Sequence, residues 1–298
     1  MVLRCGLPSI PRRRRAWQVS HLKMRRLRST GAGALRAVRS PLAGAGGARR
    51  HKRFEVKRTL RDASDRTNAA HPVTILCYGD GAVWGWDPAD GSRMAPTERW
   101  PKILEHVLND HGRTKRFRVI EEGLNARTTV LDDPFGPSDA AYSCNGRAYL
   151  MPCLHSHKPV DLVLLCLGIN DLKTHFGTTT HQIAQGNAIL TNDILRSKAG
   201  PGLDVDDHPP KVLLLAPPPI LETDISLAWG FEGATRRSEQ LPSLYAKVAQ
   251  AAGSRVRSFD LGSVAQMCPV DGVHLQRESQ IVVAEALAEV CFDMLVHR

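Results

Sequence analysis

The chain has 298 residues, 42% of them hydrophobic, which is enough for one sizeable α/β domain with an appended segment. The formal net charge of +10 is uneven, because residues 1–70 hold 19 of the 40 basic residues but only 3 of the 30 acidic ones. The rest of the chain is therefore acidic, which argues against nucleic-acid binding by the body. Its apolar runs are far shorter than the roughly 18 residues of a membrane span, and we expect a soluble, cytoplasmic protein.

Residues 1–70 form a basic N-terminal extension. They combine basic clusters at Arg12–Arg15 and Arg49–Arg53 with a Gly- and Ala-rich stretch, and no acidic residue precedes Glu55. Such a composition buries little apolar surface, so we predict that the extension is disordered. Arg-rich, acid-poor leaders resemble organelle transit peptides, and an extension without function is the alternative. A third hypothesis is an interaction protein whose extension binds anionic membranes or nucleic acid through charge alone.

Residues 71–298 alternate short apolar runs with amphipathic segments, as strands and helices do in an α/β domain. The expected strands are Val73–Tyr78, Phe117–Glu121, Asp161–Leu167, Lys211–Ala216 and Val256–Asp260. The expected helices are Pro96–Asn109, Thr180–Arg196, Thr235–Ala252 and Glu278–Val296. Almost wholly apolar strands are covered on both faces, so we predict a three-layer α/β/α sandwich with five parallel strands in flavodoxin-like order. The segment Asp132–His157, rich in Pro, Gly, Ser and Asn, is predicted to be a long loop with a function or an oligomer contact.

The seven cysteines include no C-x-x-C pair, which favours free thiols in a reducing compartment. Cys144 and Cys153 are the one pair that we single out for a disulfide. Three clusters contain metal-ligand side chains, namely Asp132-Asp133, Asp206-Asp207-His208 and His155-x-His157. Their flexible contexts favour solvated loops, so we predict no metal and no other cofactor.

Polar segments that contain glycine follow four of the expected elements, and ligands of an open α/β sheet bind at the carboxyl ends of its strands. The segments are Gly79–Gly85, Glu122–Asn125, Gly168–Asp171 and Asp271–His274. We therefore expect a ligand site where these segments meet.

Acid–base chemistry is indicated by Asp271, which lies three residues before His274 in a glycine-containing loop. Its carboxylate can accept the imidazole Nδ1–H and leave Nε2 free as a base, and an ordinary surface pair is the alternative. Asn170 can donate its side-chain amide, and Gly123 its backbone N–H, to a developing oxyanion. The alternatives are a helix-cap asparagine and an ordinary turn glycine.

The four segments resemble, in order and spacing, the four blocks of the SGNH (GDSL-type) hydrolases, over about residues 73–296. Gly79-Asp80-Gly81 stands where that family has Gly-Asp-Ser, and the other blocks match at Gly123, Gly168–Asp171 and Asp271–His274. The resemblance is closest to the arylesterase or perhydrolase-like acyltransferase branch. Supporting motifs are Trp84-Gly85-Trp86, Arg99-Trp100, Glu121–Leu124 and Ala216–Pro219.

The resemblance implies the fold and site of a serine esterase that acts on small esters or acyl groups without a metal or other cofactor. It makes His274 the base and Asp271 its orienting partner. The implied oxyanion hole comprises Gly123, Asn170 and the backbone N–H of residue 81. Trp84 and Trp86 would line the acyl or alcohol side of the pocket, with a core role as the alternative. The same branch implies a homo-oligomer.

The nucleophile position departs from the family pattern, because Gly81 has no side chain to form an acyl-enzyme. Ala82 and Val83 also depart from the family, which argues against a lone substitution in an ordinary esterase. Two hypotheses stay open. The protein is a non-catalytic relative that binds esters or carbohydrates, or it hydrolyses esters slowly through a water molecule activated by His274.

Overall fold

The computed structural model describes residues 72–111, 116–136, 142–201 and 208–296. The predictions for the extension 1–70 and for its boundary with the body lie outside these ranges, as do Asp206 and Asp207. Within the described ranges, no helix has both the length and the apolar character needed to cross a membrane.

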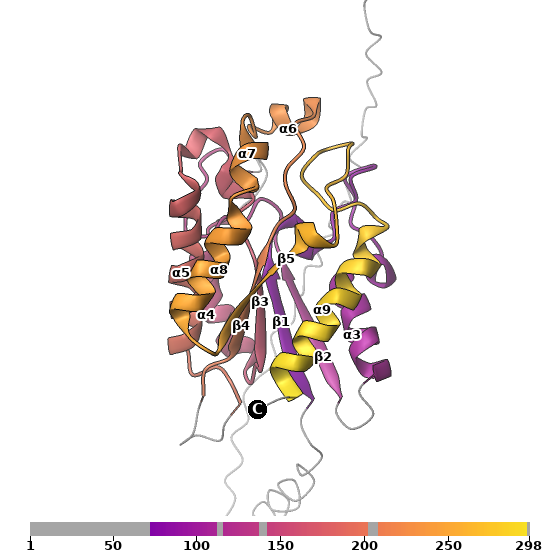
Figure 1. The fold of residues 1–298 in the computed structure, drawn as a ribbon, viewed down its shortest axis with the longest axis vertical. Coiled ribbons are helices and arrows are strands. Elements are labelled where there is room, and N and C mark those ends of the chain that lie inside the picture. Colours follow the sequence, from indigo (N-terminus) through magenta and orange to yellow (C-terminus); the bar gives the residue numbers. More distant parts are fainter. Residues whose placement is uncertain (1–71, 112–115, 137–141, 202–207, 297–298) are drawn as a thin grey trace, which may run out of the picture. The chain divides into compact units, whose positions relative to one another are not determined.

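A five-stranded parallel sheet forms the centre of the domain (Figure 1). Its strands are β1 (Val73–Gly79), β2 (Phe117–Gly123), β3 (Leu162–Cys166), β4 (Lys211–Ala216) and β5 (Val256–Asp260), in the order β2-β1-β3-β4-β5. This is the predicted flavodoxin-like order. The strand order reverses at β1, which pairs with β2 on one side and β3 on the other, and such a switch point is where open sheets bind ligands.

Helices cover both faces of the sheet, which confirms the predicted three layers (Figure 1). The helices α4 (Gly146–His157), α5 (Thr180–Arg196) and α8 (Leu241–Ala252) lie on one side, and α3 (Trp100–His111) and α9 (Ser279–Val296) lie on the other. All five residues of β3 are buried, as expected for a strand with helices on both faces. Burial of these apolar strands is the main favourable contribution to folding.

Short elements follow the strands at the end where the site forms. They are α2 (Gly81–Trp84), α6 (Asp224–Ala228) and α7 (Ala234–Ser238), with 3₁₀ turns at Pro96–Glu98, Asn170–Leu172, Thr174–Phe176 and Leu261–Ser263. The helix predicted over Thr235–Ala252 is thus two helices, α7 and α8. Pro242 is the second residue of α8, where a proline is tolerated because its missing N–H has no partner within the helix.

The predicted loop Asp132–His157 is wrong in its second half, which is helix α4. Asn145 caps this helix by accepting a hydrogen bond from the backbone N–H of Arg147 at 3.0 Å. Pro152 lies inside the helix, and this proline together with Gly146 favoured the loop prediction.

The disulfide that the sequence suggested is absent, because Cys144 and Cys153 are both free thiols. The other four cysteines in the described ranges are free as well, in line with the prediction of unpaired thiols. Cys77 and Cys166 pack inside β1 and β3, where burial raises the pKa of both thiols well above the usual value.

Candidate active site

The carboxyl ends of β1, β2 and β3 bring three of the four glycine-containing segments together. The parallel register pairs Gly79 with Gly123 on one side and with Cys166 on the other. The residues that follow each strand, including Asp80, Leu124 and Leu167, therefore leave the sheet at one edge. This edge is where a parallel α/β sheet places its ligands.

Gly123 ends β2 against the backbone of α2. A Cβ built there would lie 2.1 Å from the backbone nitrogen of Trp84 and 2.5 Å from its Cα, which no side chain tolerates. Glycine at this position thus allows the short helix that begins with Gly81 to pack on the end of β2. The two backbone N–H donors that the sequence assigned to an oxyanion hole come from these two adjoining segments.

His274 is held by Asp271 in the way that the sequence predicts. Its Nδ1 lies 2.8 Å from Asp271 Oδ2, while Asp271 Oδ1 accepts the backbone N–H groups of Val273 and His274, each at 3.0 Å. Burial by itself would raise the pKa of Asp271, but these hydrogen bonds and the charge of His274 outweigh it and lower the pKa. Asp271 is therefore a carboxylate that orients the imidazole and leaves Nε2 for other partners.

The loop of Asp271 and His274 is fixed to the segment that follows β4. Gly272 has φ of +74°, and a Cβ there would lie 1.9 Å from the carbonyl oxygen of Leu221. The backbone N–H of Leu221 donates to the carbonyl of Gly272 at 2.9 Å. Only glycine fits this close approach in the left-handed region, so the loop position is set by backbone contacts.

The imidazole of His274 faces Gly81. A Cβ built at Gly81 would lie 2.5 Å from His274 Nε2 and 3.0 Å from its Cδ2. The ring therefore fills part of the space beside Gly81 that a serine side chain would need. Asp80 starts the turn by accepting the N–H of Ala82 at 3.0 Å, which caps helix α2.

Asn170 lies beside Asp80, one residue from Gly81. Its side-chain nitrogen donates to the carbonyl of Arg127 at 3.2 Å and makes a weak 3.5 Å contact with Asp80 Oδ2. An incoming oxyanion could take over the weaker of these two contacts. Burial raises the pKa of Asp80 to about 6, although the N–H of Ala82 and the charge of His274 oppose this shift.

Asn125 ends the predicted site segment Glu122–Asn125, although no role was predicted for its side chain. Its Oδ1 is buried and has no hydrogen-bond partner among the described residues. This oxygen lies 3.3 Å from the position of a Cβ at Gly81, on the same small space that His274 faces. Buried acceptors are normally satisfied by protein or water, so Asn125 offers a place for a donor from water or a ligand.

Two indole rings flank the imidazole. Trp86 stacks on His274 with ring centroids 5.3 Å apart and planes tilted by 22°, and Trp229 meets the same ring edge-on at 6.0 Å. Trp84 lies 6.2 Å from Trp86 and carries the guanidinium of Arg93 5.3 Å above its ring. Trp86 thus lies against His274, whereas Trp84 lies one ring further out. Trp229 follows helix α6 and lies outside the four motifs in the sequence, and no sequence pattern pointed to it.

The loop after β2 is tied to its neighbours by buried polar groups. Arg127 donates to the carbonyl of Gly79 at 2.9 Å and to that of Glu122. The carboxylate of Asp171 accepts the backbone N–H of Thr129 at 3.0 Å and also its hydroxyl. Burial raises the pKa of Asp171 to about 6, and the bonds from Thr129 oppose the shift. These contacts hold the loop that carries Asn125 against β1 and β3.

The prediction of solvation holds for the exposed residues Asp132 and His155 but is wrong for Asp133 and His157. The side chain of Asp133 is fully buried, 3.0 Å from His175 Nε2 and 3.6 Å from Lys173 Nζ. His157 lies on helix α4, and its Nε2 is 2.7 Å from Glu122 Oε1. Both residues therefore contact other side chains of the protein, and the cluster around His157 is considered separately below.

Several solved structures are similar to this chain over nearly their whole length. A carbohydrate acetylesterase family member from Sinorhizobium meliloti is 37% identical, with 75% of this chain and 99% of that one covered and a TM-score of 0.67. The native aryl esterase of M. smegmatis is 39% identical, with 75% and 100% covered and a TM-score of 0.65. A putative arylesterase from Agrobacterium tumefaciens is 35% identical, with the same coverage and a TM-score of 0.64. No family model and no curated protein matches the chain.

Proposed function

Since the chain belongs to the SGNH (GDSL-type) hydrolase family and is similar to its arylesterases and carbohydrate acetylesterases, we propose that its pocket binds and slowly hydrolyses small carboxylic esters. One observation carries this proposal. The imidazole of His274, oriented by Asp271, faces Gly81 at the point where the family places its nucleophile.

The absence of a side chain at Gly81 removes the covalent route but not the rest of the machinery. Without an Oγ, no acyl-enzyme forms at this residue. The backbone N–H of Gly81 begins helix α2, and the first N–H groups of a helix have no partner within it. This N–H, together with Gly123 and Asn170, is available to stabilise a negative carbonyl oxygen.

Water is the proposed nucleophile. A water molecule between His274 Nε2 and Asn125 Oδ1 would donate one O–H to each, which satisfies the buried oxygen of Asn125. Its remaining lone pairs would face the carbonyl carbon of an ester bound beside Gly81. Both acceptors are fixed before substrate arrives, so the water would be positioned by the protein rather than by the ester.

The reaction then follows from these positions. The water oxygen bonds to the carbonyl carbon, its proton passes to His274 Nε2, and the carbonyl electron pair moves to the oxygen held by the N–H donors. When the intermediate collapses, the bond to the alcohol oxygen breaks and that oxygen takes the proton from His274. The products are the free acid and the alcohol.

The expected rate is low. General-base assistance contributes about 10²–10⁴-fold, and serine hydrolases that lose a triad member keep about 10³–10⁴-fold acceleration over water. The turnover of this protein should therefore lie orders of magnitude below that of a serine esterase of the same fold.

A non-catalytic binding protein is the second candidate. It is favoured by the position of His274 Nε2, only 2.5 Å from an ideal Cβ at Gly81, because the ring occupies part of the space that a water would use. In this case the pocket would bind an ester, its acid or a carbohydrate without turnover. The flanking rings of Trp86 and Trp229 suit either candidate, since they supply apolar contact area at low entropic cost.

Steady-state hydrolysis of a small activated aryl acetate separates the two candidates. We expect a slow, saturable activity that His274→Ala reduces to the rate in buffer alone. His106→Ala is the matched control, because His106 pairs with Asp110 on the exposed face of α3. An activity that is equal in the wild type and in His274→Ala would refute the proposed hydrolase. A wild type without turnover that still binds the acetate product would support the second candidate.

A further inference from the structure

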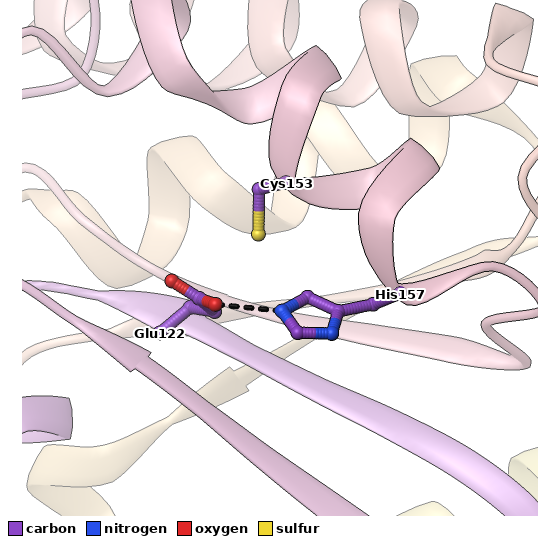
Figure 2. Close-up of side chains that lie close together, drawn as sticks. All are labelled: Glu122, Cys153 and His157. Atoms are coloured by element: carbon purple, nitrogen blue, oxygen red, sulfur yellow. Dashed lines mark hydrogen bonds and ion pairs between the residues drawn. The ribbon is translucent and has the colours of Figure 1, made fainter. Parts of the chain in front are cut away.

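Three metal-ligand side chains meet where helix α4 packs near the end of β2 (Figure 2). Glu122 comes from β2, and Cys153 and His157 come from successive turns of α4. A spacing of four residues places the two helix side chains on one face of the helix. The ligand atoms of all three residues lie within 4.8 Å of one another, so the fold itself assembles them.

The cluster combines a buried thiol with two groups that reach solvent. Cys153 is fully buried, whereas the side chains of Glu122 and His157 are 20% and 25% exposed. A solvated ion could therefore approach from the side of Glu122 and His157 and meet the sulfur behind them. Figure 2 shows the sulfur pointing toward the same space as the carboxylate and the imidazole.

Charge balance suits a divalent cation. A thiolate from Cys153 and the carboxylate of Glu122 together would neutralise a doubly charged ion, and His157 would add a neutral nitrogen ligand.

We propose that Glu122, Cys153 and His157 form a binding site for one thiophilic divalent cation, with Zn²⁺ as the best match. Sulfur, imidazole nitrogen and carboxylate oxygen are the ligand atoms that Zn²⁺ takes in proteins. The site shares no residue with the pocket of Gly81 and His274. It stands independently of the proposed esterase function, because no substrate and no catalytic step enters into it.

Binding requires only small side-chain adjustments. Tetrahedral zinc with bonds of about 2.0–2.3 Å separates its ligand atoms by about 3.3–3.7 Å. The 2.7 Å contact between His157 Nε2 and Glu122 Oε1 must therefore widen, and the sulfur must approach, through rotations at side-chain ends. The thiol proton passes to solvent on binding, and His157 would bind the ion through Nε2 as a neutral imidazole with its proton on Nδ1. Water completes the fourth position on the exposed side.

Titration of the metal-free, full-length protein with Co²⁺ is the direct test, because a cobalt–thiolate bond gives a charge-transfer band in the near ultraviolet. We expect the band to saturate at one Co²⁺ per chain and to vanish when Zn²⁺ is added. We also expect Zn²⁺ to raise the Tm, since the ion binds only the folded cluster. Failure of the wild type to develop the band at a large excess of Co²⁺ would overturn the proposal.

Substitutions identify the ligands. Cys153→Ser should abolish the band, and His157→Gln or Glu122→Gln should weaken Co²⁺ binding by about tenfold or more. His155→Gln, on the same helix, and Cys268→Ser, at a partly exposed cysteine outside the cluster, should bind as the wild type does. If Cys153→Ser fails to fold, His157→Gln carries the test alone, because the side chain of His157 is partly exposed. Retention of the band in Cys153→Ser, or unchanged affinity in His157→Gln, would overturn the proposal.

Discussion

Two histidine–carboxylate pairs in this chain have nearly the same nitrogen–oxygen distance, through Nδ1 of His274 and Nε2 of His157, and different surroundings. His274 lies 2.8 Å from Asp271, and His157 lies 2.7 Å from Glu122. The first pair faces a glycine, a buried amide oxygen and two indole rings, whereas the second faces a buried thiol. In the two proposals, the group that each pair faces sets its role: His274 would activate water beside Gly81, and His157 would bind a metal ion beside Cys153.

Substitution of Gly81, the residue that His274 faces, should have the largest effect on esterase activity. Gly81→Ser supplies the missing hydroxyl, and we expect kcat/KM for an aryl acetate to rise by about 10²–10³-fold. The new Cβ would lie 2.5 Å from His274 Nε2, so the ring must rotate away, which is feasible for the end of a side chain. Gly81→Ala adds the same Cβ without the oxygen and should gain nothing. Equal kinetics of the Ser and Ala variants would show that the remaining groups do not form a dormant triad.

Substitution of Asp271, which orients His274, should have the second-largest effect on activity. Asp271→Asn should reduce kcat/KM by about 10²-fold, because the amide does not hold the imidazole with its proton on Nδ1 and does not stabilise its charged form. The matched control is Asp110→Asn, which removes the carboxylate of an exposed pair on α3. Wild-type kinetics in Asp271→Asn would mean that the first pair is only structural.

The carboxyl group of Asp80, near His274, should make the free energy of unfolding depend on pH. Burial raises the pKa of Asp80 from 3.8 to about 6, so folding favours its protonated form. The contribution of Asp80 to the free energy of unfolding is therefore greatest below about pH 4 and decreases by about 1–3 kcal/mol as the pH rises to about 6. Urea unfolding of the wild type and of Asp80→Asn between pH 4 and pH 7 measures this difference. A difference that stays constant with pH would contradict the buried position of the carboxyl.

Asn125 should have the smallest effect of the four. Asn125→Ala removes the oxygen that is proposed to hold the attacking water, and we expect kcat to fall about tenfold with little change in KM. Asn192→Ala, at an exposed position of α5, is the control. A larger effect on KM than on kcat would assign Asn125 to substrate binding instead.

The sequence was sufficient for the sheet and for the residues that adjoin it. The apolar run at Leu162–Cys166 and the spaced apolar residues of Thr180–Arg196 depend on local patterns that burial makes strong. The loop with Asp271 and His274 was also accessible, because three residues separate the two groups. Their catalytic roles stay predictions until kinetics are measured.

What the sequence did not provide depends on contacts across the chain. Because Pro152 argued against a helix, α4 was not predicted. Without a predicted helix, the four-residue spacing of Cys153 and His157 did not place them on one face. Glu122 lies on β2 and the other two residues lie on α4, so only the fold brings its carboxylate to the thiol. Trp229 reaches His274 from the segment after α6, which no local pattern marks, and the segment of Asn125 was predicted without a role for its side chain.

The most direct test of the proposed esterase mechanism is a pre-steady-state measurement of the first turnover. Rapid mixing of the wild type with excess aryl acetate measures phenolate release before the steady state. We predict a linear time course without a burst, because water attacks the ester and no acyl-enzyme accumulates, while Gly81→Ser should show a burst if its deacylation is slower than its acylation. A wild-type burst equal to the enzyme concentration would contradict the account, since it would require another nucleophile in the pocket.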